Sequence, residues 1–119
     1  MNLSFGEVQS FVSDLGRARD FYERVLGLRL VKEAPKWLIF DISGTTLVVM
    51  AGARPRKYDG TYGSESGTVT CLMTDDIDRD YAELKAQGVS FFSEVNEVAE
   101  GRYVGFQDPD GNLLELIQK

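Results

Sequence analysis

The chain carries the same pattern of elements twice, and this duplication limits its possible folds more than any other feature. In the first half a strand-like run at 7–13 precedes a helix start with the sequence Asp14-Leu15-Gly16-Arg17. In the second half a strand-like run at 68–74 precedes a matching start, Asp76-Ile77-Asp78-Arg79. Internal self-similarity of this kind predicts two copies of one structural unit.

Each half is expected to continue as one helix followed by three strands. Asp14 and Asp76 are suitable N-cap residues, and a glycine follows the last apolar position of each helix. The 3.6-residue period of the apolar side chains predicts helices over Leu15–Leu26 and Ile77–Gln87. Strands are predicted at Leu28–Lys32, Trp37–Ile42, Thr45–Met50, Val89–Phe92, Tyr103–Phe106 and Asn112–Gln118.

These units predict an α+β fold built from two tandem βαβββ modules. The modules occupy residues 1–51 and 68–119, and residues 52–67 form a connecting loop. A helix packed on one face of each set of strands leaves the other face to curve inward. We therefore expect a curved eight-stranded mixed sheet around a cleft, with the helices on its outer face. The loop contains Arg54, Arg56 and Lys57 but has no periodicity, which favours a solvated linker over an anion-binding lid.

The composition excludes several classes of function. The sequence contains no histidine, the commonest general base and metal ligand, and its net charge of −6 disfavours nucleic acid and anionic membranes as partners. No apolar run is long enough to cross a bilayer, and the first residues do not resemble a signal peptide. Cys71 is the only cysteine, which fits the cytoplasm, and it is expected to be a small buried hydrophobe.

Glu115 is the strongest candidate for a functional side chain. The strong turn sequence 108–112 leads into an alternating strand, in which Glu115 shares a face with Leu113 and Ile117. A carboxylate between two apolar neighbours is unusual on a solvated face. Glu7 has a similar place in the first strand. We therefore expect the two carboxylates to line a shared cavity.

Several motifs resemble those of the vicinal oxygen chelate superfamily, which includes glyoxalases, bleomycin resistance proteins and ring-cleaving dioxygenases. The motifs cover nearly the whole chain and lie at residues 12–15, 21–22, 25–28, 75–78, 88–89 and 106–116. The resemblance implies a cleft whose floor carries four metal ligands in the metal-dependent members. The corresponding positions here are Glu7, Val48, Val69 and Glu115.

This set of side chains predicts that the protein works without a metal cofactor. The family pattern has His or Gln, a carboxylate or His, then His, and finally Glu. Glu115 matches and Glu7 is a substitute, but Val48 and Val69 have no donor atom. Two carboxylates could in principle hold Mg²⁺ or Mn²⁺ with waters, so a divalent metal is the alternative.

The first functional interpretation is a binding protein like the bleomycin resistance members, which sequesters a small, partly apolar and cationic ligand. A pocket with aromatic and methionine walls above acidic groups suits such a molecule. Ordinary core packing is an equal alternative for any one of Phe11, Trp37, Met50 and Met73. The expected ligand-binding residues are Glu7, Gln9, Phe11, Trp37, Val48, Met50, Val69, Met73, Tyr103 and Glu115.

Two other interpretations remain open. The chain could be an enzyme (a lyase, isomerase or dioxygenase) that uses Glu115 and Glu7 as a general base or as ligands of a divalent metal. It could also be an interaction domain whose cleft is filled by its own large side chains. In each case the resemblance and the exposed strand edges expected of a small chain favour a homodimer.

Overall fold

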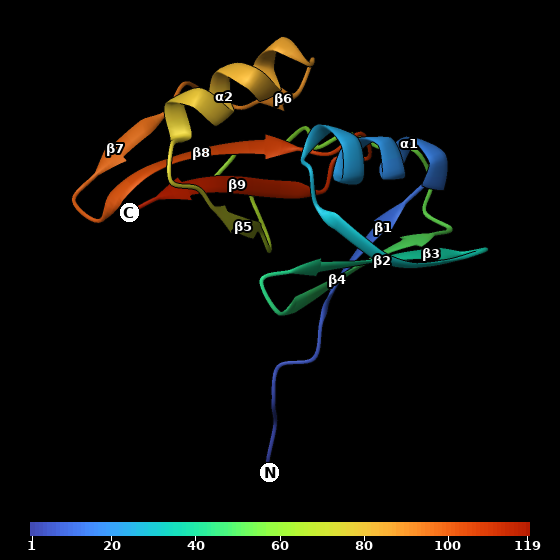
Figure 1. Cartoon of the computed structure of the whole chain (residues 1–119). Coiled ribbons are helices and arrows are strands. Elements are labelled where there is room, and N and C mark those ends of the chain that lie inside the picture. Colours follow the sequence, from blue (N-terminus) through green and yellow to red (C-terminus); the bar gives the residue numbers. More distant parts are fainter. The chain divides into compact units, whose positions relative to one another are not determined.

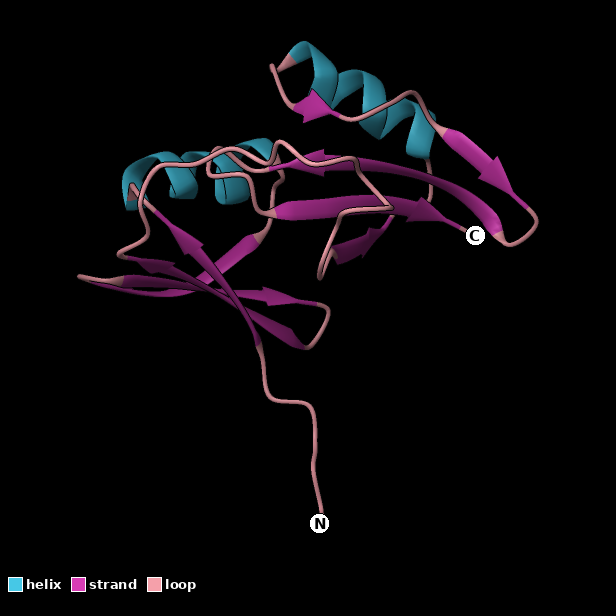
Figure 2. Ribbon diagram, turned by 180° about the vertical axis from the view of Figure 1, so that it is seen from behind, coloured by secondary structure: helices cyan, strands magenta, loops and turns pink.

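The computed structural model describes residues 1–119 and divides the chain into two compact units, Met1–Pro55 and Arg56–Lys119. Each unit consists of one sheet with helical structure packed on one of its faces (Figure 1 and Figure 2). No helix combines the length and the apolar character needed to span a lipid bilayer.

The first unit follows the order strand, helix, three strands, as the sequence predicts. Strand β1 runs parallel to β4, and the other neighbours are antiparallel, which gives the order β1-β4-β3-β2. The elements are β1 (Val8–Val12), α1 (Leu15–Arg19), η1 (Asp20–Val25), β2 (Arg29–Ala34), β3 (Trp37–Ile42) and β4 (Thr45–Ala51).

The predicted first helix is confirmed, but its winding changes part-way. Asp14 caps its start by accepting a 3.0 Å hydrogen bond from the amide of Arg17. From Asp20 the helix widens to the π form, and the amide of Leu26 donates to the carbonyl of Phe21 at 2.9 Å. Tyr22, in the widened part, is buried with its ring centroid 5.9 Å from that of Phe40.

The two faces of the first sheet differ sharply. The face beneath the helix forms the core of this unit, whose buried apolar residues are Val12, Ala18, Phe21, Tyr22, Leu38, Phe40, Leu47 and Val49. On the other face, the register aligns Gln9 with Val48, and Phe11 with Met50 and Trp37. Val48 is buried there at 8% exposure, whereas Phe11 and Trp37 remain 46% and 38% exposed, so that face is apolar and only partly covered.

The second unit repeats the plan with one additional strand. Its sheet has the order β5-β9-β8-β6, and β7 also pairs with β8. The strand predicted at Val89–Phe92 corresponds to the short strand β6, and the short strand β7 follows where none was predicted. The elements are β5 (Thr70–Met73), α2 (Ile77–Ala86), β6 (Ser90–Phe91), β7 (Asn96–Val98), β8 (Gly101–Gln107) and β9 (Leu113–Gln118). The α+β class is confirmed, with the strands divided between a four-stranded and a five-stranded sheet.

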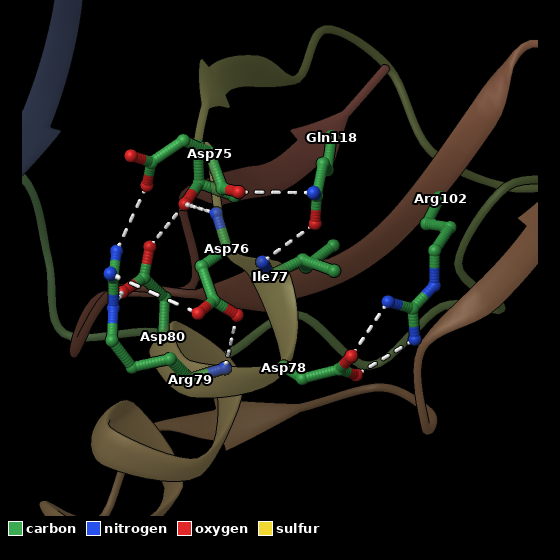
Figure 3. A network of polar contacts seen from close by, with 9 residues as sticks. Asp75, Asp76, Ile77, Asp78, Arg79, Asp80, Arg102 and Gln118 are labelled. Carbon is green, nitrogen blue, oxygen red and sulfur yellow. Dashed lines mark hydrogen bonds and ion pairs between the residues drawn. The ribbon is translucent and has the colours of Figure 1, made fainter.

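A polar network fixes the start of α2 to the last strand (Figure 3). Asp76 caps the helix by accepting from the amide of Arg79 at 3.1 Å. The side chain of Gln118 accepts from the amide of Ile77 at 2.9 Å and donates to the carbonyl of Asp75 at 3.0 Å. Arg102 forms two 2.7 Å hydrogen bonds with the carboxylate of Asp78. The helix is therefore tied to β8 and β9 at its first turn.

The segment 52–67 contains no helix or strand, but its second part is not a solvated linker. Arg56 donates to the side chain of Asn112 at 2.7 Å, and the amide of Tyr58 donates to Gln107 at 3.2 Å. A Cβ atom on Gly111, where φ is +81°, would lie 2.6 Å from the amide nitrogen of Tyr58. The linker expectation is therefore wrong for Tyr58 and Tyr62, which contact the rest of the second unit, whereas most other residues of the segment are exposed.

Candidate functional site

Tyr62 lies flat on the second sheet, on the face opposite α2. Its ring stacks on that of Phe92, with centroids 4.9 Å apart and planes 16° apart. Beneath it lies Gly105 of β8, where an added Cβ would be only 2.7 Å from Cε1 and Cε2 of Tyr62. The absence of a side chain at Gly105 is therefore what lets the ring reach the sheet.

The hydroxyl of Tyr62 donates a 2.5 Å hydrogen bond to Oε2 of Glu115 in β9. Burial raises the pKa of the Tyr62 phenol, and the hydrogen bond and the charge of Glu115 raise it further. The phenol therefore stays protonated and keeps its role as a donor. This contact places an uncharged donor and an acidic acceptor together above the strands.

A cavity of about 410 Å³ opens beside this pair. Its size suits a small organic molecule, and its walls combine aromatic rings, backbone and one carboxylate. The lining residues are Tyr62, Gly63, Ser66, Gly67, Val69, Tyr103 and Glu115.

Three of the residues expected from the sequence, Val69, Tyr103 and Glu115, line this cavity. Met73 lies on the same sheet face, in the pairing row of Ile117 and Tyr103, but it is 62% exposed and does not line the cavity.

The other expected residues belong to the first unit. Glu7 lies just before β1, is exposed, and accepts a 2.9 Å hydrogen bond from the side chain of Gln9. The rest occupy the sheet face opposite the helix: Gln9, Phe11, Trp37, Val48 and Met50. A cavity shared by Glu7 and Glu115 stays a prediction.

The sequence analysis missed Tyr62, because it lies in a segment without periodicity. Gly63, Ser66 and Gly67 were missed for the same reason. One signal was available in Gly105, a glycine inside a strand, which often marks a close approach by another group.

Cys71 differs from its expected role as a buried hydrophobe, because the residue is exposed on the open sheet face. It pairs in register with Glu115 across β5 and β9. Although the residue as a whole is exposed, partial loss of water around its sulfur raises the pKa of the thiol. The nearby charge of Glu115 adds to the increase. The thiol is therefore a poor nucleophile near neutral pH.

The side chains do not fit the four-ligand metal centre implied by the family resemblance. No group of three or more His, Cys, Asp or Glu side chains is arranged to hold an ion. Val48 and Val69 offer no donor atom, and Glu115 already accepts from Tyr62. The chain therefore lacks two of the four ligands of that centre.

The sequence profile of the glyoxalase/bleomycin resistance protein/dioxygenase superfamily matches residues 4–116. The chain belongs to this superfamily. Among curated proteins, YurT of Bacillus subtilis is 30% identical over an alignment of 119 positions, which covers 92% of this chain and 94% of YurT.

Solved structures of the superfamily share the fold and differ in activity. TnmS3, an antibiotic binding protein from a Streptomyces species, is 30% identical with a TM-score of 0.71, and the match covers 98% of each chain. Lactoylglutathione lyase from Agrobacterium tumefaciens is 20% identical with a TM-score of 0.74, over 97% of this chain and 92% of the lyase. The fosfomycin resistance protein FosX from Listeria monocytogenes is 22% identical with a TM-score of 0.74, over 100% of this chain and 95% of FosX. The last two establish the fold alone.

Proposed function

We propose that this superfamily member is a metal-free binding protein that sequesters a small, partly apolar ligand carrying a positive charge. The observation that carries the proposal is the position of Glu115, whose carboxylate forms one wall of a cavity otherwise lined by tyrosines, Val69 and small residues. A carboxylate in such surroundings recognises a cationic hydrogen-bond donor strongly and specifically.

The charges near the cavity support a cationic ligand. The hydrogen-bond partner of Glu115 is a neutral phenol, so its negative charge is not compensated by that contact. The net charge of −6 adds a weak long-range attraction for cations. The aromatic ring of Tyr103 offers a face on which a cation or a flat ring can rest.

The likeness to TnmS3 supports binding as the function class, since that protein is described as an antibiotic binding protein. By analogy we propose a drug-like ligand here and a role in antibiotic resistance, in a cytoplasmic homodimer. Met73 and the residues of the first unit expected from the sequence (Glu7, Gln9, Phe11, Trp37, Val48 and Met50) would then supply further ligand contacts.

Ligand screening with matched variants tests this proposal. Flat aromatic cations should raise the melting temperature of the wild-type protein, since a ligand specific for the folded state stabilises it. E115Q should weaken their binding about 10- to 100-fold, the range for loss of a charged hydrogen bond. E100Q makes the same charge change at an exposed residue outside the cavity and should leave affinity unchanged. Equal affinities for wild type and E115Q would rule out this role for Glu115.

Elemental analysis tests the metal-free part separately. Purified protein incubated with Ni²⁺, Zn²⁺ or Mn²⁺ and then desalted should retain no stoichiometric metal. Stoichiometric metal that disappears in E115Q would reverse this part of the proposal and favour an enzyme.

The hydrogen bond between Tyr62 and Glu115 favours a second candidate, a metal-free lyase or isomerase. In that case Glu115 removes a proton from the substrate as general base, because a carboxylate in an apolar cavity can take that role. E115Q separates the two functions. An enzyme loses turnover while keeping most of its substrate affinity, whereas a binding protein loses affinity for cationic ligands.

A further inference from the structure

We propose that the ligand is a flat aromatic molecule with a hydrogen-bond donor at the edge of its ring, and that Tyr62 occupies the ligand's place in the free protein. This inference rests on the proposed binding function and specifies the class of ligand. Tyr62 is then an internal occupant of the site, which the ligand displaces on binding.

The surroundings of Tyr62 are those of a binding slot for a phenol. One ring face stacks on Phe92, and the ring lies on the backbone of Gly105, where no side chain intervenes. Its hydroxyl meets the carboxylate of Glu115 at 2.5 Å. The slot thus provides a stacking partner, a flat floor and an acceptor at the distance that an aromatic hydroxyl or amino group requires.

The slot and its occupant come from different kinds of structure. Gly105 and Glu115 lie in paired strands of the sheet, whereas Tyr62 lies in a segment with no helix or strand. The floor and the acceptor of the slot therefore keep their backbone geometry without Tyr62, while the stacking partner Phe92 lies just after β6.

The turn that carries Tyr62 is held together mainly by its own hydrogen bonds. The amide of Thr61 donates to the side chain of Glu65 at 2.5 Å, and the amide of Glu65 donates back to the carbonyl of Thr61 at 2.8 Å. The amide of Gly63 donates to the hydroxyl of Ser66 at 2.9 Å. None of these bonds involves the sheet, so withdrawal of Tyr62 leaves them intact. Its release requires the loss of its stacking on Phe92 and of its hydrogen bond to Glu115.

A tethered side chain competes strongly with a free ligand. Short flexible connections give effective concentrations of the order of millimolar. The apparent affinity of a ligand that must displace Tyr62 is therefore its intrinsic affinity multiplied by the fraction of molecules in which the slot is open. Removing the Tyr62 ring abolishes this competition.

The first experiment measures binding of p-cresol, which reproduces the tyrosine side chain, to Y62A by isothermal titration calorimetry. Y62A should bind p-cresol at least 10-fold more tightly than the wild type, and toluene, which lacks the hydroxyl, much more weakly than p-cresol. E115Q in the Y62A background should weaken this preference, because the amide oxygen of glutamine still accepts a hydrogen bond but carries no charge. The control is Y81A, which deletes a tyrosine whose ring contacts Phe91 and not Phe92.

The second experiment uses the wild-type sequence with labelled tyrosines, so it does not depend on the folding of Y62A. Fluorine NMR of protein labelled with meta-fluorotyrosine, with Tyr62 assigned through Y62F, follows the ring directly. Added p-cresol should move the Tyr62 resonance towards the position of an exposed tyrosine. An unmoved resonance at the solubility limit of p-cresol overturns the inference. So does equal binding of p-cresol and toluene by Y62A, or an equal gain in Y81A.

The outcomes separate this inference from the proposed function. If cationic aromatic ligands bind through Glu115 while the Tyr62 resonance stays fixed, the binding function stands and Tyr62 is a fixed wall of the cavity. If no cationic ligand binds in a way that depends on Glu115, both proposals fail.

Discussion

Tyr62 and Gly105 approach each other so closely that a methyl group at position 105 would lie 2.7 Å from two carbons of the Tyr62 ring. Tyr62 comes from the segment between the two repeated halves, and Gly105 is buried in strand β8. A glycine in the interior of a strand usually weakens the strand relative to alanine. Its presence here is explained by the ring that it accommodates.

G105A should therefore have opposite effects in two backgrounds. In the wild type, the added methyl group displaces Tyr62, and we expect the free energy of unfolding to fall by about 1–3 kcal/mol. In Y62A the space is empty, and alanine should raise the free energy of unfolding by about 0.5–1 kcal/mol through its better strand propensity. Urea denaturation of the four proteins measures both changes. Equal losses in the two backgrounds would show that the ring does not determine the residue at position 105.

Tyr62 should titrate later than an exposed tyrosine. Burial, followed by the hydrogen bond to Glu115, raises the pKa of its phenol in the folded state. The stabilisation linked to this shift is complete below the ordinary tyrosine pKa of about 10 and is lost as the pH rises above that value. Tyr62 should therefore contribute to the fraction of tyrosine absorbance that resists ionisation in the folded protein, alongside the buried Tyr22. That fraction should fall by the absorbance of one tyrosine in Y62F, and an unchanged fraction would show that Tyr62 ionises with the exposed residues.

Cys71 reports on the charge of Glu115 from the neighbouring strand. Burial of the thiol, and then the carboxylate of Glu115, raise the pKa of Cys71. Since the thiolate is the reactive form, we expect slow reaction with a disulfide reagent at neutral pH. E115Q removes the charge and should speed the reaction by lowering the thiol pKa, whereas E100Q should not. A rate unchanged by E115Q would mean that the charge does not reach the sulfur.

Local patterns in the sequence were sufficient for the repeated units and for the faces of their strands. The alternation around Glu115 correctly separated Leu114 and Leu116, which are buried beneath α2, from the open face. The cap at Asp14 likewise fixed the start of the first helix. Each of these signals involves residues within one helical turn or one strand, where period and capping chemistry decide the outcome.

The contacts that build the candidate site could not be found in this way. Tyr62 and Glu115 are 53 residues apart in the sequence, and no periodicity connects a loop residue with a strand. The contact of Phe92 could not be found for the same reason. Alternation places Phe91 and Phe92 on opposite faces, and Phe91 packs near Tyr81 and Phe106. Alternation does not show that Phe92 meets the ring of Tyr62, which comes from the loop.

The last prediction concerns Gln118, which holds the start of α2 against β9 (Figure 3). Q118A removes the acceptor for the amide of Ile77 and the donor to the carbonyl of Asp75. At about 1 kcal/mol for each hydrogen bond, the free energy of unfolding should fall by about 1–2 kcal/mol. Hydrogen exchange at the amide of Ile77 should accelerate. Q118E keeps an acceptor but loses the donor, so it should retain more protection at Ile77 than Q118A. K119A, a truncation of the exposed neighbouring residue, serves as the control. Unchanged exchange at Ile77 in Q118A would mean that the capping contacts of Asp76 hold the helix start without Gln118.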